Sequence, residues 1–146
     1  TSFGLCMTSS DGPCSRVVTF AAMLPLCMCT SLIFWLSSIP ALTPPDLGVT
    51  WSDKVYHAIA FFGYGLSTML ALIACRPSWS AMQVRLVAVV WGTCFAMSDE
   101  WHQSMVINRS AGWDDVAADV VGLLLSTAAL TWLRLLYAFA ASRTHR

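Results

Sequence analysis

Two groups of polar side chains interrupt an apolar sequence, and their residue types are those that transfer protons or bind charged ligands. The first group is Asp53, Lys54 and His57. A carboxylate beside an imidazole can act as a general base, and a Lys side chain can bind a phosphate or a carboxylate. The second group lies further along the chain and adds acids, an amide and a guanidinium; it comprises Asp99, Glu100, Gln103, Arg109, Asp115 and Asp119.

The elements that position these groups are predicted to be membrane-spanning helices. Of the 146 residues, 57% are hydrophobic and 11% are charged, whereas a soluble domain carries about a quarter charged residues. This composition excludes an ordinary soluble globule, and the zero net charge argues against nucleic-acid binding. Four stretches are long and apolar enough to cross a bilayer. They are Val17 to Ile39, Lys54 to Cys75, about Ala81 to Met97, and Asp115 to Ala141.

We therefore predict an all-α membrane protein, an antiparallel bundle of four transmembrane helices embedded in the lipid bilayer. A short N-terminal arm (residues 1–15) precedes the bundle (16–141), and a basic tail (142–146) follows it. Four spans place both termini on one side of the membrane. That side holds six of the eight basic residues, and the opposite side holds seven of the eight acids. By the positive-inside rule, both termini are expected in the cytoplasm and the polar groups on the outer side.

The polar residues are expected at the ends of the second, third and fourth helices. Asp53 can cap the second helix, and Lys54 and His57, three residues apart, share one of its faces. Asp99 and Glu100 are predicted to close the third helix, where a carboxylate has the sign that the helix dipole disfavours. That misfit indicates a specific role for these two acids.

Asp115, Asp119 and Gly122 form a polar stripe on the fourth helix. Their spacings of four and three residues place them on one face, and the glycine admits a close neighbour. Asp119 lies at membrane depth, where an unpaired carboxylate is costly, so it must be protonated, bound to a cation or paired with a basic side chain. The candidate partners are Arg109, Lys54 and His57.

Taken together, these motifs resemble the VanZ-like family. The family pattern is Asp-Lys-x-x-His, then Ser-Asp-Glu-x-x-Gln, an Arg, and Asp-x-x-x-Asn-x-x-Gly. The matching positions are Asp53, Lys54, His57, Ser98, Asp99, Glu100, Gln103, Arg109, Asp115, Asp119 and Gly122. Asp119 stands where the family usually has Asn. Asn108 precedes Arg109, where the family has a Pro-Gly pair before the Arg. The first departure adds a negative charge, and the second predicts a differently shaped loop.

The resemblance implies a small integral protein of the bacterial cytoplasmic membrane, linked to resistance to glycopeptide antibiotics such as teicoplanin. It supplies no reaction. We prefer a binding function, in which Lys54 and Arg109 hold the head group of an envelope lipid or a cell-wall precursor. The family-matched polar residues, Ser98 among them, are the candidate ligand-binding set.

Two alternatives from other functional classes stay open. In a hydrolase or transferase acting on a lipid-linked substrate, Glu100 or Asp99 is the general base and His57 relays protons. In an accessory subunit of a larger membrane complex, the polar cluster is an interhelical clamp. No cofactor is predicted, and a divalent cation is the weakest hypothesis. Its candidate ligands are Asp99, Glu100, Asp115 and Asp119.

Overall fold

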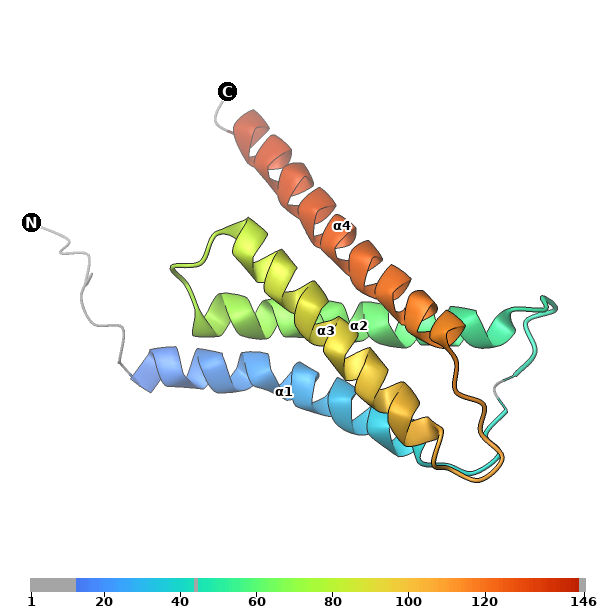
Figure 1. Cartoon of the computed structure of the whole chain (residues 1–146). Coiled ribbons are helices and arrows are strands. Elements are labelled where there is room, and N and C mark those ends of the chain that lie inside the picture. The colour runs from blue at the N-terminus through green and yellow to red at the C-terminus, as the bar shows by residue number, and fades with distance from the viewer. Residues whose placement is uncertain (1–12, 44, 145–146) are drawn as a thin grey trace, which may run out of the picture.

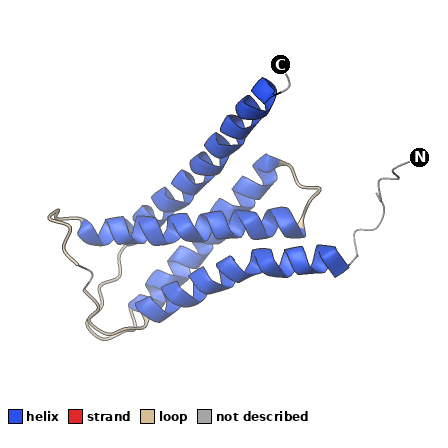
Figure 2. Cartoon of the chain, turned by 180° about the vertical axis from the view of Figure 1, so that it is seen from behind, coloured by secondary structure: helices blue, strands red, loops and turns tan. Residues whose placement is uncertain are grey.

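The computed structural model describes residues 13–43 and 45–144 of the chain. Within these residues it contains four helices and no strand, which confirms the predicted all-α class (Figure 1, Figure 2). The helices are α1 (Pro13–Ser37), α2 (Ser52–Cys75), α3 (Ala81–Gln103) and α4 (Trp113–Thr144). All four are long and apolar enough to cross a membrane, so the chain is a multi-pass membrane protein.

The terminal segments extend the helical core beyond the limits predicted from sequence. Helix α1 already begins at Pro13, and α4 continues to Thr144. Most of the predicted N-terminal arm (residues 1–12) and the end of the predicted tail (145–146) lie outside the described residues.

Helix α2 is the centre of the bundle. It contacts α1, α3 and α4, whereas α1 and α4 do not contact each other within the described residues. Successive helices run in opposite directions, so the loops α1–α2 and α3–α4 lie at one end and the α2–α3 loop lies at the other (Figure 1). This arrangement brings the polar residues of α2, α3 and α4 to the same end.

Helix α3 is longer than its apolar pattern indicates. The pattern predicts an end near Met97, but α3 continues to Gln103. Asp99 and Glu100 therefore lie inside the helix, about one turn before its end, and do not close it. Gln103 Nε2 donates to Asp99 Oδ2 at 2.9 Å across that turn. The hydropathy pattern places the end of α3 too early because these polar side chains have hydrogen-bond partners inside the protein.

The predicted cap of α2 is wrong. Helix α2 begins at Ser52, and the residue at the cap position, Trp51, makes no capping hydrogen bond with its side chain. Asp53 lies in the first turn, and its carboxylate accepts a hydrogen bond from Lys54 Nζ at 2.8 Å instead. An acid in the first turn still interacts favourably with the helix dipole. Asp53 therefore supports α2 by charge and not as a cap.

Helices α2 and α4 approach to backbone contact beside the polar site. A Cβ atom at Gly122 would collide with the carbonyl oxygen of Ala58 and would lie 2.9 Å from the backbone nitrogen of Phe62. The close neighbour predicted for this glycine is thus the backbone of α2. Deeper in the bundle, Phe61 and Tyr64 are buried and belong to the hydrophobic core.

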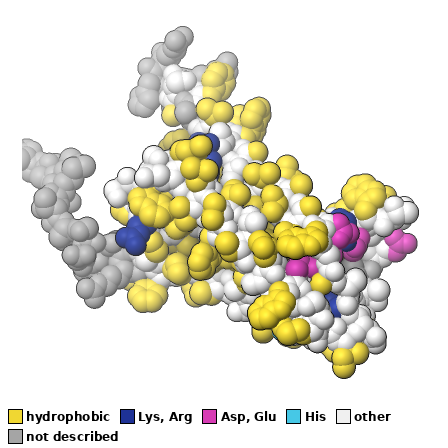
Figure 3. Space-filling model, viewed as in Figure 1, with side chains coloured by type: hydrophobic (Ala, Val, Ile, Leu, Met, Phe, Trp, Pro, Cys, Tyr) yellow, Lys and Arg dark blue, Asp and Glu magenta, His cyan; other side chains and the backbone are white. Residues whose placement is uncertain are grey.

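The described surface is divided between apolar flanks and one acidic end. On the face seen in Figure 3, hydrophobic side chains cover the helical flanks, and the visible acids gather at the end formed by the α1–α2 and α3–α4 loops. At the opposite end, Arg76 caps α2 and Arg85 lies in the first turns of α3. Of the described basic residues, Lys54 and Arg109 lie at the acidic end, as predicted, and Arg76 and Arg85 lie at the opposite end.

Candidate functional site

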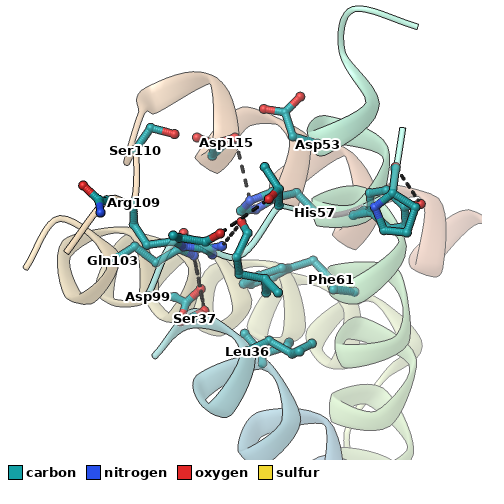
Figure 4. A pocket seen from close by; sticks show the side chains of 18 residues that line it. Leu36, Ser37, Asp53, His57, Phe61, Asp99, Gln103, Arg109, Ser110 and Asp115 are labelled. Carbon is teal, nitrogen blue, oxygen red and sulfur yellow. Dashed lines mark hydrogen bonds and ion pairs between the residues drawn. The ribbon is translucent and has the colours of Figure 1, made fainter. Parts of the chain in front are cut away.

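A pocket of about 760 Å³ opens at the acidic end of the bundle. Figure 4 shows that Asp53, Ser110 and Asp115 lie on one side of it, and that Leu36 and Phe61 lie on the other. The pocket therefore has a polar part and an apolar part. Its lining residues are Ile33, Leu36, Ser37, Ala41, Leu42, Thr43, Pro45, Asp53, Tyr56, His57, Ala60, Phe61, Asp99, Gln103, Asn108, Arg109, Ser110 and Asp115.

Two loops form the mouth of this pocket and are bonded to each other. The backbone nitrogen of Ala41 donates to the carbonyl oxygen of Ile107 at 3.3 Å. One guanidinium nitrogen of Arg109 donates to the carbonyl oxygen of Leu42 at 3.0 Å. Asn108, just before Arg109, has a φ of 57°, a left-handed conformation that Asn adopts more readily than most residues. This turn carries Arg109 towards the loop that follows α1.

Lys54 joins the start of α2 to the start of α4. Its Nζ lies 2.8 Å from Asp53 Oδ2 and 2.8 Å from Asp114 Oδ2, and it also forms an ion pair with Asp115. The Asp114 side chain is 70% exposed, whereas that of Asp115 is 8% exposed. Since solvent screens exposed ion pairs, the Lys54–Asp115 pair contributes most to the link between the two helices.

His57 is the partner of the deeply placed Asp119. Its Nδ1 lies 3.0 Å from Asp119 Oδ1 and 3.9 Å from Glu100 Oε1. Its Nε2 lies 3.8 Å from Asp115 Oδ1. The side chain of Asp119 is fully buried. Of the three candidate partners for Asp119, the structure therefore selects the imidazole, which is surrounded by carboxylates from α3 and α4.

A second hydrogen-bond network connects α1 to the end of α3. Asp99 Oδ2 accepts from Ser37 Oγ at 2.8 Å and from Gln103 Nε2 at 2.9 Å. Gln103 Oε1 accepts from Arg109 at 2.7 Å. Arg109 thus binds an amide oxygen and the carbonyl oxygen of Leu42, and it is not the partner of Asp119. Both Asp99 and Gln103 are buried.

Sequence reasoning missed three contributors to the site. Ser37 is buried and bonded to Asp99, and the backbone nitrogen of Gly112 donates to Glu100 Oε2 at 3.0 Å. His102 Nε2 lies 3.0 Å from Ser38 Oγ, a second contact between the end of α1 and α3. The pair Ser37-Ser38 at the end of an otherwise apolar span was the available signal. A backbone donor such as that of Gly112 cannot be predicted from residue type, because nearly every residue has a backbone N–H.

Of the ten predicted ligand-binding residues, Ser98 is the one that the structure places outside the cluster. Its side chain is exposed, and its hydroxyl donates to the carbonyl oxygen of Phe95 within α3. Successive residues of a helix point about 100° apart. Ser98 therefore faces away from the site while its neighbour Asp99 faces into it.

Four buried polar atoms in the cluster have no hydrogen-bond partner among the described residues. They are Asp99 Oδ1, Glu100 Oε1, Asp119 Oδ2 and Arg109 Nε. Leaving such a group unpaired costs about 1–3 kcal/mol, more when it is charged. The site therefore has unused capacity to bind protons, an ion or a polar ligand.

The structure also changes which residues are candidate metal ligands. His57, Glu100 and Asp119 offer ligand atoms that all lie within 4.8 Å of one another. Asp99 and Asp115, which the sequence placed in the candidate set, do not belong to this group of three. Ser37 and Gln103 donate hydrogen bonds to Asp99, and Lys54 forms an ion pair with Asp115.

Comparison with models of known protein families identifies a match. The family model described as VanZ/LLP1 matches residues 15–134, which is most of the chain. Searches of curated proteins and of solved structures give no significant match.

Proposed function

We propose that this chain, which belongs to the VanZ/LLP1 family, binds the polar head group of an envelope lipid in the pocket at the acidic end of its bundle. The observation that carries the proposal is the division of that pocket. Leu36 and Phe61 supply an apolar surface, whereas Asp53, Arg109 and Asp115 supply charged groups. A volume of about 760 Å³ falls in the range of small-molecule sites.

The charges of the pocket favour a head group that combines an anion with an amine. Arg109 offers a buried Nε donor with no partner among the described residues, which suits a phosphate oxygen. Asp53 and Asp115 line the same pocket, and carboxylates attract an ammonium group. Lys54 already pairs with three carboxylates, so Arg109 is the main anion-binding side chain in this proposal.

The head group would enter from the outer side of a bacterial cytoplasmic membrane. Arg76 and Arg85 lie at the end opposite to the acids, and the positive-inside rule places an arginine-rich end in the cytoplasm. Both termini would then be cytoplasmic. The link to glycopeptide resistance follows from the family resemblance. A bound surface lipid or cell-wall precursor would be masked from the drug without any bond being broken.

The test is lipid retention by protein extracted directly into polymer nanodiscs, measured by mass spectrometry. We expect enrichment of one head-group class over the surrounding membrane, and loss of that enrichment in Arg109→Ala. Arg76→Ala is the matched control, because Arg76 is exposed and lies at the opposite end of α2. Equal lipid profiles for the wild type and both variants would refute the proposal.

A hydrolytic or transfer reaction on a lipid-linked substrate is the second candidate. It is favoured by Glu100 Oε1, which is buried, lacks a hydrogen-bond partner among the described residues and lies 3.9 Å from His57 Nδ1. A carboxylate in such a position is suited to accept a proton. Turnover of the retained lipid by the wild type, lost in Glu100→Gln, would favour this candidate. A stoichiometric protein partner in the same preparation would favour an accessory subunit instead.

A further inference from the structure

Three helices each direct one metal-binding side chain to a common point inside the bundle. His57 comes from α2, Glu100 from α3 and Asp119 from α4, and their ligand atoms lie within 4.8 Å of one another. His57 Nδ1 lies 3.0 Å from Asp119 Oδ1 and 3.9 Å from Glu100 Oε1. Metal bonds of about 2.1 Å in tetrahedral geometry place ligand atoms about 3.4 Å apart. The observed separations bracket that value.

Unpartnered carboxylate oxygens on two of these three residues are an independent indication of a ligand. Glu100 Oε1 and Asp119 Oδ2 are buried and accept no hydrogen bond from the described residues. The residues that carry them are 6% and 0% exposed. Two buried carboxylate oxygens without a donor are costly, and a shared cation removes that cost.

The neighbouring Lys and Arg side chains are bonded to groups other than Glu100 and Asp119. Lys54 pairs with the acids at the start of α2 and α4, and Arg109 donates to Gln103 and to Leu42. His57 is therefore the one basic side chain in contact with the carboxylates of Glu100 and Asp119 among the described residues. One divalent ion would balance the two negative charges.

The surroundings of these three side chains also match those of a metal site. Glu100 Oε2 accepts from the backbone nitrogen of Gly112, which fixes the carboxylate and leaves Oε1 free. His57 Nε2 lies 3.8 Å from Asp115 Oδ1, and Asp115 is itself paired with Lys54. When one imidazole nitrogen binds a metal, the other N–H is commonly directed at a carboxylate, which orients the ring.

We propose that His57, Glu100 and Asp119 bind one divalent transition-metal ion of the Zn²⁺ and Mn²⁺ type. An imidazole among the ligands favours such ions over Ca²⁺ and Mg²⁺, which prefer oxygen alone. Asp115 is a positioning residue that acts through the His57 ring. Three protein ligands leave at least one coordination position for water or for a polar group of a ligand. The proposal does not depend on head-group binding.

The test measures metal content and affinity in the full-length protein in nanodiscs. After removal of metal with a chelator, the protein is titrated with Zn²⁺ and with Mn²⁺, and bound metal is quantified by mass spectrometry. We expect one ion per chain in the wild type and a loss of affinity of roughly tenfold or more in Asp119→Asn. Asp114→Asn is the matched control, because Asp114 neighbours the site but is exposed and outside the metal group.

Two results would overturn the proposal. One is a wild-type protein that binds less than one ion per chain at micromolar free metal. The other is equal affinity in the two Asp→Asn variants. If Asp119→Asn does not fold, Co²⁺-loaded wild-type protein is examined by NMR. A strongly shifted imidazole resonance that is absent from His57→Ala supports the site, and a spectrum without one refutes it.

Discussion

His57 and Asp119 face each other across α2 and α4, with Nδ1 3.0 Å from Oδ1, one turn away from the point where Gly122 brings the two helices into backbone contact. The glycine and the ion pair are neighbours on the same contact between α2 and α4. A short distance between helix backbones is what allows an imidazole to reach a fully buried carboxylate. The pair in turn removes the cost of an unpaired acid at membrane depth.

Replacement of Gly122 tests the close contact between α2 and α4. In Gly122→Ala, the new methyl group would collide with the backbone of α2 at Ala58, which cannot move aside as a side chain can. We expect a loss of about 1–3 kcal/mol in stability, as is typical of overpacking. Thermal unfolding in nanodiscs measures it. Gly63→Ala is the control, because a Cβ there has no described atom within 4 Å apart from its chain neighbours and the backbone of its own stretch of helix. Equal unfolding temperatures for the two variants would contradict the close contact.

A second prediction compares two serines near the acids of α3. Ser37→Ala removes the hydroxyl that donates to buried Asp99, so we expect a loss of about 1–3 kcal/mol in unfolding free energy. Ser98→Ala removes an exposed hydroxyl bonded within its own helix, and we expect a change within about 0.5 kcal/mol. Chemical denaturation in mild detergent gives both values. The reverse order would place Ser98 and not Ser37 in the site.

The contrast between these serines shows what sequence can and cannot predict. Hydropathy and length predict the four helices because a bilayer demands about 20 apolar residues per span. The same measure fails at the end of α3, where the side chains of Asp99 and Gln103 form a hydrogen bond inside the protein. It also cannot indicate which of the two neighbours, Ser98 or Asp99, faces the site, because that depends on how the helices pack.

Pairing within the site is a further limit of sequence. The sequence offers three basic partners for Asp119, and each is chemically adequate. His57 is the partner because the α2–α4 contact brings it to Asp119. Arg109 binds Leu42 instead, because its loop lies against the loop after α1. These are tertiary facts. The predicted set of polar residues is brought together at one end of the bundle, except for Ser98, but the connections among its members required the structure.

A third prediction concerns Arg109 as the connection between the two loops. Arg109→Ala loses the hydrogen bonds to Leu42 and Gln103, so the loops should separate more often. We expect faster hydrogen exchange at the Ala41 amide, which donates to the other loop at Ile107. Arg76→Ala is the control, since Arg76 lies at the opposite end of α2. Unchanged exchange at Ala41 in Arg109→Ala would mean that the backbone contact alone holds the loops.

The last prediction is the orientation of the bundle, which determines whether an outer lipid can reach the pocket. The acids and the pocket occupy one end, and Arg76 and Arg85 occupy the other, so the acidic end should face outward. In a background without native cysteines, Ser110→Cys should react with an impermeant thiol reagent on intact cells. Ser78→Cys, in the α2–α3 loop, should react only after the membrane is permeabilised. Both serines are exposed, so differences in burial do not explain a difference in labelling. The opposite pattern would place the pocket in the cytoplasm, where its ligand would have to come from the inner leaflet and masking of a surface precursor would be excluded.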